Sequence, residues 1–461
     1  MPGTKVLKVQ QPGYKPVVQN LEKSNFDSSD SYCFQDWIQQ YGGSLEPDRL
    51  KMLSDLKRVL VVINRVTLSV IAKRKSYSQE LDDYIISFDD FSLSEFGSNW
   101  SKVGFTQDGT EMTIATYVNK NIVNITMNDY YFDPTRQIKA TKDVFNIFEG
   151  LVSKPKDHGI DISPLLKHIS LVLSNENDQY FQYILKWMKR SYVKLEKTNV
   201  ALLFVGMEGS GKGVFFQKFV IPFLFGSKYG MTNDNISRLF QQFNGLMAHK
   251  LFIVADESKS KVNGTEYDLL KSLITNTERD VEFKFKERKV VKDCINYVFC
   301  TNNYNTIPIT ETCRRFAVFG VDSSFAPMNP TNESSERQEI CDNYWKSLVS
   351  CFTKKHAEQF LHYLDTKVDD NFNLEANIPH TDARKNMITL GMNPILLFAK
   401  QVIEIHDKEF IKRLDMYSKY QIFCLDNSII KPLNKVDFYK SLLATGKFRD
   451  VRNAVDGFRA V

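Results

Sequence analysis

The sequence predicts an α/β fold built on an open, mostly parallel sheet. Three apolar runs, VALLFV, KLFIVAD and INYVFCTN, lie between residues 200 and 302, and each ends in polar or glycine-rich residues. Their length and continuous apolar character are typical of strands buried on both faces. In open α/β sheets the chemistry is found at the carboxyl ends of the strands. We therefore expect the functional site where the three runs end.

The chain around this sheet divides into stretches of different texture. The start is rich in Pro, Gly, Ser and Asn, the next hundred residues mix short helices and strands, and residues 140–198 look helical. The last fifty residues have a rhythm of their own, for which a winged-helix DNA-binding unit and an ordinary helical cap both remain open. The expected parts are a flexible leader (1–30), an N-terminal α+β domain (31–135), a helical collar (136–198), the α/β core (199–326), a helical C-terminal segment (327–413) and the last unit (414–461).

Composition narrows the class of protein. Of the 461 residues, 43% are hydrophobic and 25% are charged, which is ordinary for a soluble globular chain. The net charge of +5 is too small to argue for nucleic acid by itself. Seven cysteines without a CxxC pair are typical of an intracellular, reducing compartment. With no signal peptide and no apolar run of bilayer length, we expect neither secretion nor membrane insertion.

The first strand runs into the glycine-rich loop GMEGSGKG, and a helix-like stretch follows it. Glycines let backbone N–H groups curl around phosphates, and a lysine at this position reaches the β and γ phosphates. Gly213 stands where Ser or Thr usually offers a hydroxyl to Mg²⁺, which leaves more of the metal's shell to water, phosphate and an acid elsewhere. The predicted ATP-binding residues are Gly206, Glu208, Gly209, Ser210, Gly211, Lys212, Gly213 and Val214.

Polar residues end the next two strands. Asp256 and Glu257 end the run KLFIVADE, and the functional interpretation is that Asp256 holds Mg²⁺ through water while Glu257 polarises the attacking water. The alternative is a solvated strand end. Asn302, at the end of INYVFCTN, could orient that water and sense the γ phosphate, or simply mark a turn.

Two sets of basic residues, one after Asn302 and one before it, are further candidates for contacts with phosphate groups. Arg314 and Arg315 either form a structural ion pair or reach the γ phosphate of a neighbouring subunit. The stretch DVEFKFKERKVVKDC reads as a hairpin whose charged tip is either a solvated face or a contact for a phosphate backbone. The candidate DNA-binding residues there are Lys284, Lys286, Arg288 and Lys289.

Taken in order, GMEGSGKG, LFIVADE, FKFKERK, FCTNN and CRRF resemble the motifs of superfamily 3 helicases, above all the helicase half of poxvirus-type and phage primase-helicases. The resemblance covers roughly residues 130–461. It implies an AAA+ P-loop NTPase core and a replicative helicase that uses ATP and Mg²⁺. It further implies a hexameric ring moving 3′ to 5′ on single-stranded or forked DNA, with a polymerase or primase partner.

By matching motif positions, the resemblance implies that one subunit supplies Lys212, Asp256, Glu257 and Asn302 to its own ATP site. It also implies that Arg315, or Arg314, reaches the ATP site of the next subunit. Gly213 departs from the usual pattern and puts magnesium affinity in question. Three other functions are alternatives. An ATP-switched origin-binding protein without unwinding stays open, and a nucleotide kinase would explain GKG but fits the later motifs poorly. A primase site fits less well still, since the pairs Asp82–Asp83 and Asp89–Asp90 lack the expected histidine and third acid.

Overall fold

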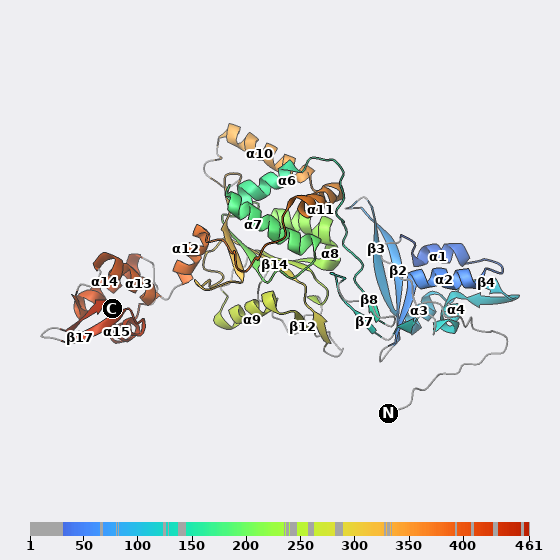
Figure 1. The fold of residues 1–461 in the computed structure, drawn as a ribbon, viewed down its shortest axis with the longest axis horizontal. Helices are drawn as coiled ribbons and strands as arrows, with labels where there is room; N and C mark the ends of the chain where they lie inside the picture. The colour runs from blue at the N-terminus through green and yellow to red at the C-terminus, as the bar shows by residue number, and fades with distance from the viewer. Residues whose placement is uncertain are drawn as a thin grey trace, which may run out of the picture.

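The chain folds into three bodies, which Figure 1 shows in a row from the N-terminal to the C-terminal unit. They are seen in a computed structural model. The residues that it describes are 31–64, 68–79, 81, 83–122, 126–127, 129–136, 144–234, 236, 239, 247–256, 262–281, 289–326, 329, 332, 334–391, 394–406, 410–426, 432–452 and 456–460.

The central body is built on a five-stranded sheet in which every neighbouring pair is parallel. The order across the sheet is β10-β11-β14-β9-β15. The predicted parallel sheet is therefore confirmed, and the three apolar runs are its three middle strands. The strands are β9 (Ala201–Val205), β10 (Gly230–Asn233), β11 (Phe252–Asp256), β14 (Asn296–Thr301) and β15 (Phe316–Gly320).

Both faces of this sheet are buried, because side chains alternate between two cores. Leu202 and Phe204 of β9 point into the larger core, and Leu203 and Val205 point into the smaller one. The smaller core is closed by α9 (Gly264–Thr275) and α12 (Asp382–Gly391). The larger is closed by α6 (Ser163–His168), η1 (Ile169–Leu173), α7 (Asp178–Met188), η2 (Lys189–Val193), η3 (Phe215–Phe225), α10 (Ser335–Ser350) and α11 (Lys354–Lys367), with the short α8 (Gly226–Tyr229) after η3. The segments η1, η2 and η3 are π-helical.

The expected helical collar at 136–198 is wrong in two respects. Among its described residues, 144–146 form a strand and 147–162 carry no helix, so helix begins only at Ser163. The helices that follow are a layer of the central body, because they share its core. Trp187 of α7, for example, packs its ring against Phe252 of β11 and donates from Nε1 to the carbonyl of Val200 at 2.6 Å. The segment 327–413 likewise returns to this body through α10, α11 and α12.

The N-terminal unit is a small α+β fold with the sheet order β3-β2-β1-β6. Polar caps explain where its helices begin: Asp48 accepts from the N–H of Lys51 at 3.0 Å, and Ser92 and Glu95 cap each other's backbone. Trp37 and Tyr117 are buried in its core. Its elements are α1 (Phe34–Tyr41), α2 (Arg49–Val59), β1 (Leu60–Asn64), β2 (Leu68–Ser78), β3 (Asp83–Ser92), α3 (Leu93–Asn99), β4 (Gly104–Gln107), β5 (Thr110–Thr113), α4 (Ile114–Lys120) and β6 (Thr126–Met127).

A buried carboxylate joins this unit to the central body. The segment that leads there pairs β7 (Asp129–Tyr131) with β8 (Val144–Asn146) in parallel. Glu149 then accepts from the N–H of Phe88 in β3 at 2.5 Å and pairs with Lys228 of α8, while its own N–H donates to the hydroxyl of Tyr229 at 2.9 Å. Burial raises the pKa of Glu149, and Lys228 opposes that shift. One side chain thus connects β3 with the helical segment that follows the loop.

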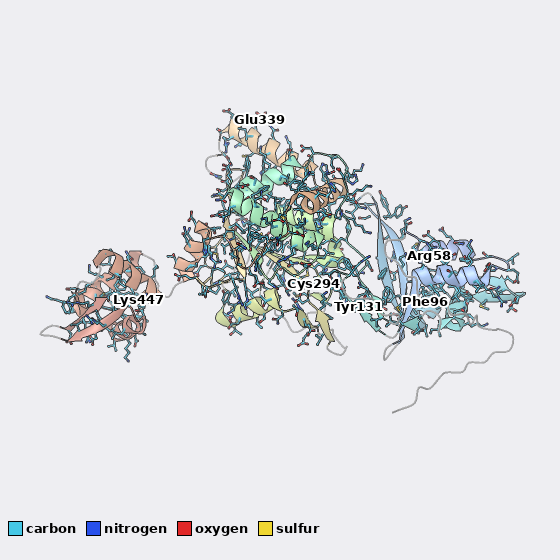
Figure 2. All side chains as sticks on the ribbon, viewed as in Figure 1. Arg58, Phe96, Tyr131, Cys294, Glu339 and Lys447 are labelled. Atoms are coloured by element: carbon cyan, nitrogen blue, oxygen red, sulfur yellow. The ribbon has the colours of Figure 1, made fainter. Side chains whose placement is uncertain are left out.

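The C-terminal unit begins earlier than residue 414. Phe398 of α13 packs its ring on Tyr420, Phe423 and Phe438, and Ile395 lies in the same core. The unit is not a purely helical cap, since it contains an antiparallel sheet in the order β16-β18-β17. Figure 2 shows Lys447 on this unit, away from Cys294 in the central body. Its elements are α13 (Pro394–His406), β16 (Phe410–Lys412), α14 (Arg413–Asp426), α15 (Lys435–Ala444), β17 (Phe448–Arg452) and β18 (Asp456–Ala460).

Two further features bear on the class of protein. Within the described ranges, no helix combines the length and apolar character needed to cross a membrane. All seven cysteines are buried and none is in a disulfide. Burial also raises the pKa of the Cys300 thiol, so the proton is held more firmly than in a free cysteine.

We predict that the chain can be divided after Gly391 but not at residue 410. A fragment starting at Pro394 keeps the aromatic core of the C-terminal unit, whereas a cut at 410 removes Ile395 and Phe398 from it. Losing one large core side chain lowers the free energy of unfolding by about 3–5 kcal/mol, which is a large part of the total for a small unit. Both fragments should be compared by circular dichroism and thermal unfolding. A cooperative transition in the fragment from 410 and none in the fragment from 394 would contradict this boundary.

Candidate functional site

The site is assembled by the register of three adjacent parallel strands. Asp256 of β11 is paired with Cys300 of β14, and Thr301 of β14 is paired with Val205 of β9. The strands therefore end at the same level, and the chain leaves each of them on the same edge of the sheet. This brings the glycine-rich loop after β9, Asn302 after β14 and Asp256 at the end of β11 into one place.

The loop after β9 has the backbone that its glycines predict. Gly209 and Gly211 have φ values of +75° and +92°, in the left-handed region where a side chain would be strained. The predicted phosphate-binding residues from Gly206 to Val214 all lie in this turn, and η3 starts at Phe215 directly after them. Consecutive N–H groups in such a turn, at the start of a helical segment, form an anion-binding concavity.

Lys212 lies within the loop and is only 6% exposed. Its Nζ donates to the carbonyls of Gly206 and Met207 at 3.3 and 3.0 Å, and to Oδ1 of Asn302 at 2.5 Å. Two residues that are 90 positions apart are thereby brought together. These three acceptors are neutral oxygens, so they do not cancel the positive charge that the ammonium group can offer to an anion.

Asp256 meets a partner that sequence reasoning missed. The side-chain amide of Gln217, in η3, donates to Oδ2 of Asp256. A Cβ atom at Gly213 would lie 2.6 Å from that same Oδ2 and 3.1 Å from Nε2 of Gln217. The missing side chain at Gly213 is thus what lets Asp256 and Gln217 meet. The only available sequence signal was the spacing of four residues between Gly213 and Gln217, which places both on one face of a helix.

Arg315 lies at the opposite edge of the sheet. It precedes β15, and its carbonyl accepts from the N–H of Ala201, the first residue of β9. Because β9 and β15 are parallel, Lys212 and Arg315 are separated by the length of five strand residues, about 16 Å. Nε of Arg315 is buried without a hydrogen-bond partner among the described residues, and the neighbouring Arg314 is exposed.

Several predicted residues fall outside the description. Glu257, Lys284, Lys286 and Arg288 lie outside the described residues, as does Asp82. Lys289 begins β13, but its side chain is also outside the description.

The predicted hairpin itself is present: β12 (Glu278–Val281) and β13 (Lys289–Lys292) pair in antiparallel. A buried polar cluster fixes its base to β14. Arg279 donates from Nε and Nη2 to Oδ2 of Asp293 at 2.9 and 2.6 Å, and from Nη2 to the hydroxyl of Tyr297 at 2.6 Å. Lys197 lies 3.1 Å from Asp293 as a second cation. The base of the hairpin is therefore rigidly tied to the strand that carries Asn302 at its other end.

Aromatic side chains support the loop from behind. Nδ1 of His168 lies 2.7 Å from the hydroxyl of Tyr344, and its Nε2 is buried without a hydrogen-bond partner in the described part of the chain. A Cβ atom at Gly211 would collide with the indole of Trp345 and lie 3.0 Å from the His168 ring. Burial lowers the pKa of His168 to about 4, and the backbone of Gly211 acts in the opposite direction. No sequence motif marked these residues, because they come from α6 and α10, far from the loop.

Comparisons with known proteins agree with this architecture. Residues 204–315, from the end of β9 to Arg315, match DUF5906, which is described as a family of unknown function. The DNA primase-polymerase of Nitratiruptor phage NrS-1 is 24% identical over 160 residues, or 34% of this chain, and the match spans only 22% of that protein. Two solved apo structures of the NrS-1 C-terminal region cover 84% of this chain and 95% and 96% of their own, with 18% and 17% identity and a TM-score of 0.53 in both cases. At that identity the structures show a shared fold.

We predict that His168 makes the protein less stable as the pH falls from about 6.5 to about 4. The unfolded chain binds the imidazole proton near pH 6.5, whereas the folded state resists it to about pH 4. Below that window the folded state should have lost ~3 kcal/mol relative to neutral pH. Urea unfolding at several pH values should give a shallower pH dependence for His168→Gln. The exposed His380→Gln serves as the matched control, and an unchanged slope in His168→Gln would contradict the assignment.

Proposed function

We propose that this chain is an ATP-driven motor on single-stranded DNA that works in the replication of phage or related DNA, as a ring of six subunits with an AAA+ type core. The observation that carries the proposal is the convergence of Lys212, Asn302 and Asp256 at a glycine-rich loop on one edge of a parallel sheet. Phosphoryl transfer needs little covalent chemistry from a protein, and it needs positioning and charge stabilisation at such a place.

Each converging group has a task in ATP hydrolysis. The loop N–H groups and Lys212 bind the phosphates, and Asn302, already bonded to Lys212, would report on the γ phosphate. Asp256 would hold Mg²⁺, and the ion would supply positive charge against the charge that develops on the phosphate oxygens. Glu257 follows Asp256 directly in the sequence and is proposed as the base that polarises water.

The position of Arg315 supports a site shared between subunits. Arg315 lies at the edge of the sheet opposite to Lys212, so its guanidinium cannot reach the glycine-rich loop of its own subunit without crossing the sheet. We infer that Arg315 completes the site of the next subunit, while Arg314 remains the second candidate.

DNA would be gripped by the hairpin between β12 and β13, with Lys284, Lys286, Arg288 and Lys289 as the candidate contacts. The Arg279–Asp293 cluster supports this assignment, since it ties the hairpin base to β14 and so to Asn302. The C-terminal unit has the succession helix, strand, two helices and hairpin of a winged helix, and is proposed to bind duplex at a fork. Similarity to a phage DNA primase-polymerase supports a replication context and a polymerase or primase partner.

We predict that Lys212→Ala weakens ATP binding by about 10- to 100-fold, since a hydrogen bond to a charged group is worth roughly 1.5–3 kcal/mol. Glu257→Gln should bind ATP normally and lose turnover by at least about a hundredfold, because water is no longer polarised. Nucleotide binding and phosphate release should be measured with and without single-stranded DNA. The exposed Lys218→Ala is the control for Lys212. If both Lys212→Ala and Glu257→Gln retain wild-type turnover, the nucleotide site lies elsewhere.

We also predict that two inactive variants complement each other when mixed. Arg315→Ala should lower turnover by about a thousandfold or more if it acts on a neighbour's γ phosphate. In mixed rings, a subunit carrying Lys212→Ala would still supply an intact Arg315 to the loop of an Arg315→Ala subunit. ATPase activity should therefore reappear on mixing the two. Activity that stays at the sum of the separate variants would argue against shared sites.

A further inference from the structure

The loop of this chain lacks the hydroxyl that usually completes a magnesium shell, and the space of that missing side chain is already taken. A Cβ atom at Gly213 would lie 2.6 Å from Oδ2 of Asp256 and 3.1 Å from Nε2 of Gln217. Both distances are too short for ordinary contact, so no serine or threonine fits there as the site stands. The amide of Gln217 therefore lies beside the position from which a side chain at 213 would present its hydroxyl.

The orientation of this amide is set by its neighbour. An ionised carboxylate only accepts hydrogen bonds, so the group of Gln217 that faces Oδ2 of Asp256 must be its NH₂. The carbonyl oxygen, Oε1, is then the free end of the amide. It makes no hydrogen bond to any described residue, and the side chain is only partly buried. The backbone holds Gln217 in place as well, because its N–H donates to the carbonyl of Gly213 at 2.9 Å.

We propose that Oε1 of Gln217 is a ligand of the nucleotide-bound magnesium and replaces the hydroxyl that Gly213 cannot provide. The inference rests on the proposed ATP site. It fits the chemistry of the ion, since Mg²⁺ prefers hard oxygen ligands and an amide carbonyl is one of them. It also explains how one residue serves two tasks, with NH₂ orienting Asp256 and the oxygen facing the metal.

The test measures how much Mg²⁺ tightens the binding of a non-hydrolysable ATP analogue, by comparing dissociation constants in Mg²⁺ and in EDTA. This readout does not depend on turnover. Gln217→Leu should lower the magnesium effect by at least about tenfold, the low end of what partners of a metal ligand contribute. Binding in EDTA should stay unchanged, because Lys212 and the loop are intact. The exposed Gln182→Leu is the matched control for removing an amide.

Gln217→Glu separates a metal ligand from a residue that only orients Asp256. It keeps an oxygen but loses the NH₂ donor, so the magnesium effect should survive if Gln217 is a ligand. If Gln217→Glu loses the effect as fully as Gln217→Leu, the oxygen is not a ligand and the proposal is overturned. Thermal unfolding of each variant without nucleotide separates loss of the fold from loss of the metal.

A double variant gives an independent test. Gly213→Ser alone should perturb the site, because its Cβ meets Nε2 of Gln217 and Oδ2 of Asp256. Gly213→Ser with Gln217→Ala removes the first conflict and the hydrogen bond from Gln217 to Asp256, and it offers a hydroxyl again, so the magnesium effect should return toward wild type. No recovery together with a wild-type effect in Gln217→Leu would refute the proposal. If the wild-type chain binds no nucleotide at all, the proposed function fails instead.

Discussion

The common level at which β9, β14 and β11 end is the constraint on which the rest of the structure depends. Parallel strands put all their carboxyl ends on one edge, but only matching register brings those ends together. The pairing of Asp256 with Cys300 and of Thr301 with Val205 fixes that register. A shift by one residue would also reverse which side chains face each of the two cores, so the packing of the sheet protects the geometry of the site.

The elements of the central sheet were predictable because their signals are local and strong. VALLFV, KLFIVAD and INYVFCTN are continuous apolar runs, and the glycines of the loop require a conformation that few other residues adopt. The helix of Trp187 was recognisable by its periodicity, but its place was not. The sequence contains no mark that these helices cover the sheet, and a collar was therefore expected where a layer of the core lies.

The parts of the site that could not be predicted depend on contacts between distant segments. His168 supports Gly211 from α6, and Tyr344 and Trp345 come from a helix that begins more than 120 residues after the loop. Gln217 was closer to recognition, since it lies on the same helical face as Gly213. Its contact with Asp256 could not be predicted, because the sequence does not show which atoms lie where a side chain at Gly213 would be. The start of the C-terminal unit at Pro394 could not be predicted either, because it is defined by contacts of Phe398 with rings that lie far along the chain, on Tyr420 and Phe438.

Glu149 links the N-terminal unit to the helical segment behind the glycine-rich loop. Its carboxylate holds the backbone of β3 on one side and Lys228 on the other, and Lys228 belongs to the helical segment that continues from η3 behind the loop. Separating this ion pair is unfavourable, because Glu149 is buried and its carboxylate would be left without a cation. Displacing η3 would therefore strain this contact with the edge strand β3, so the junction restricts how far the N-terminal unit and the helices behind the loop can move apart.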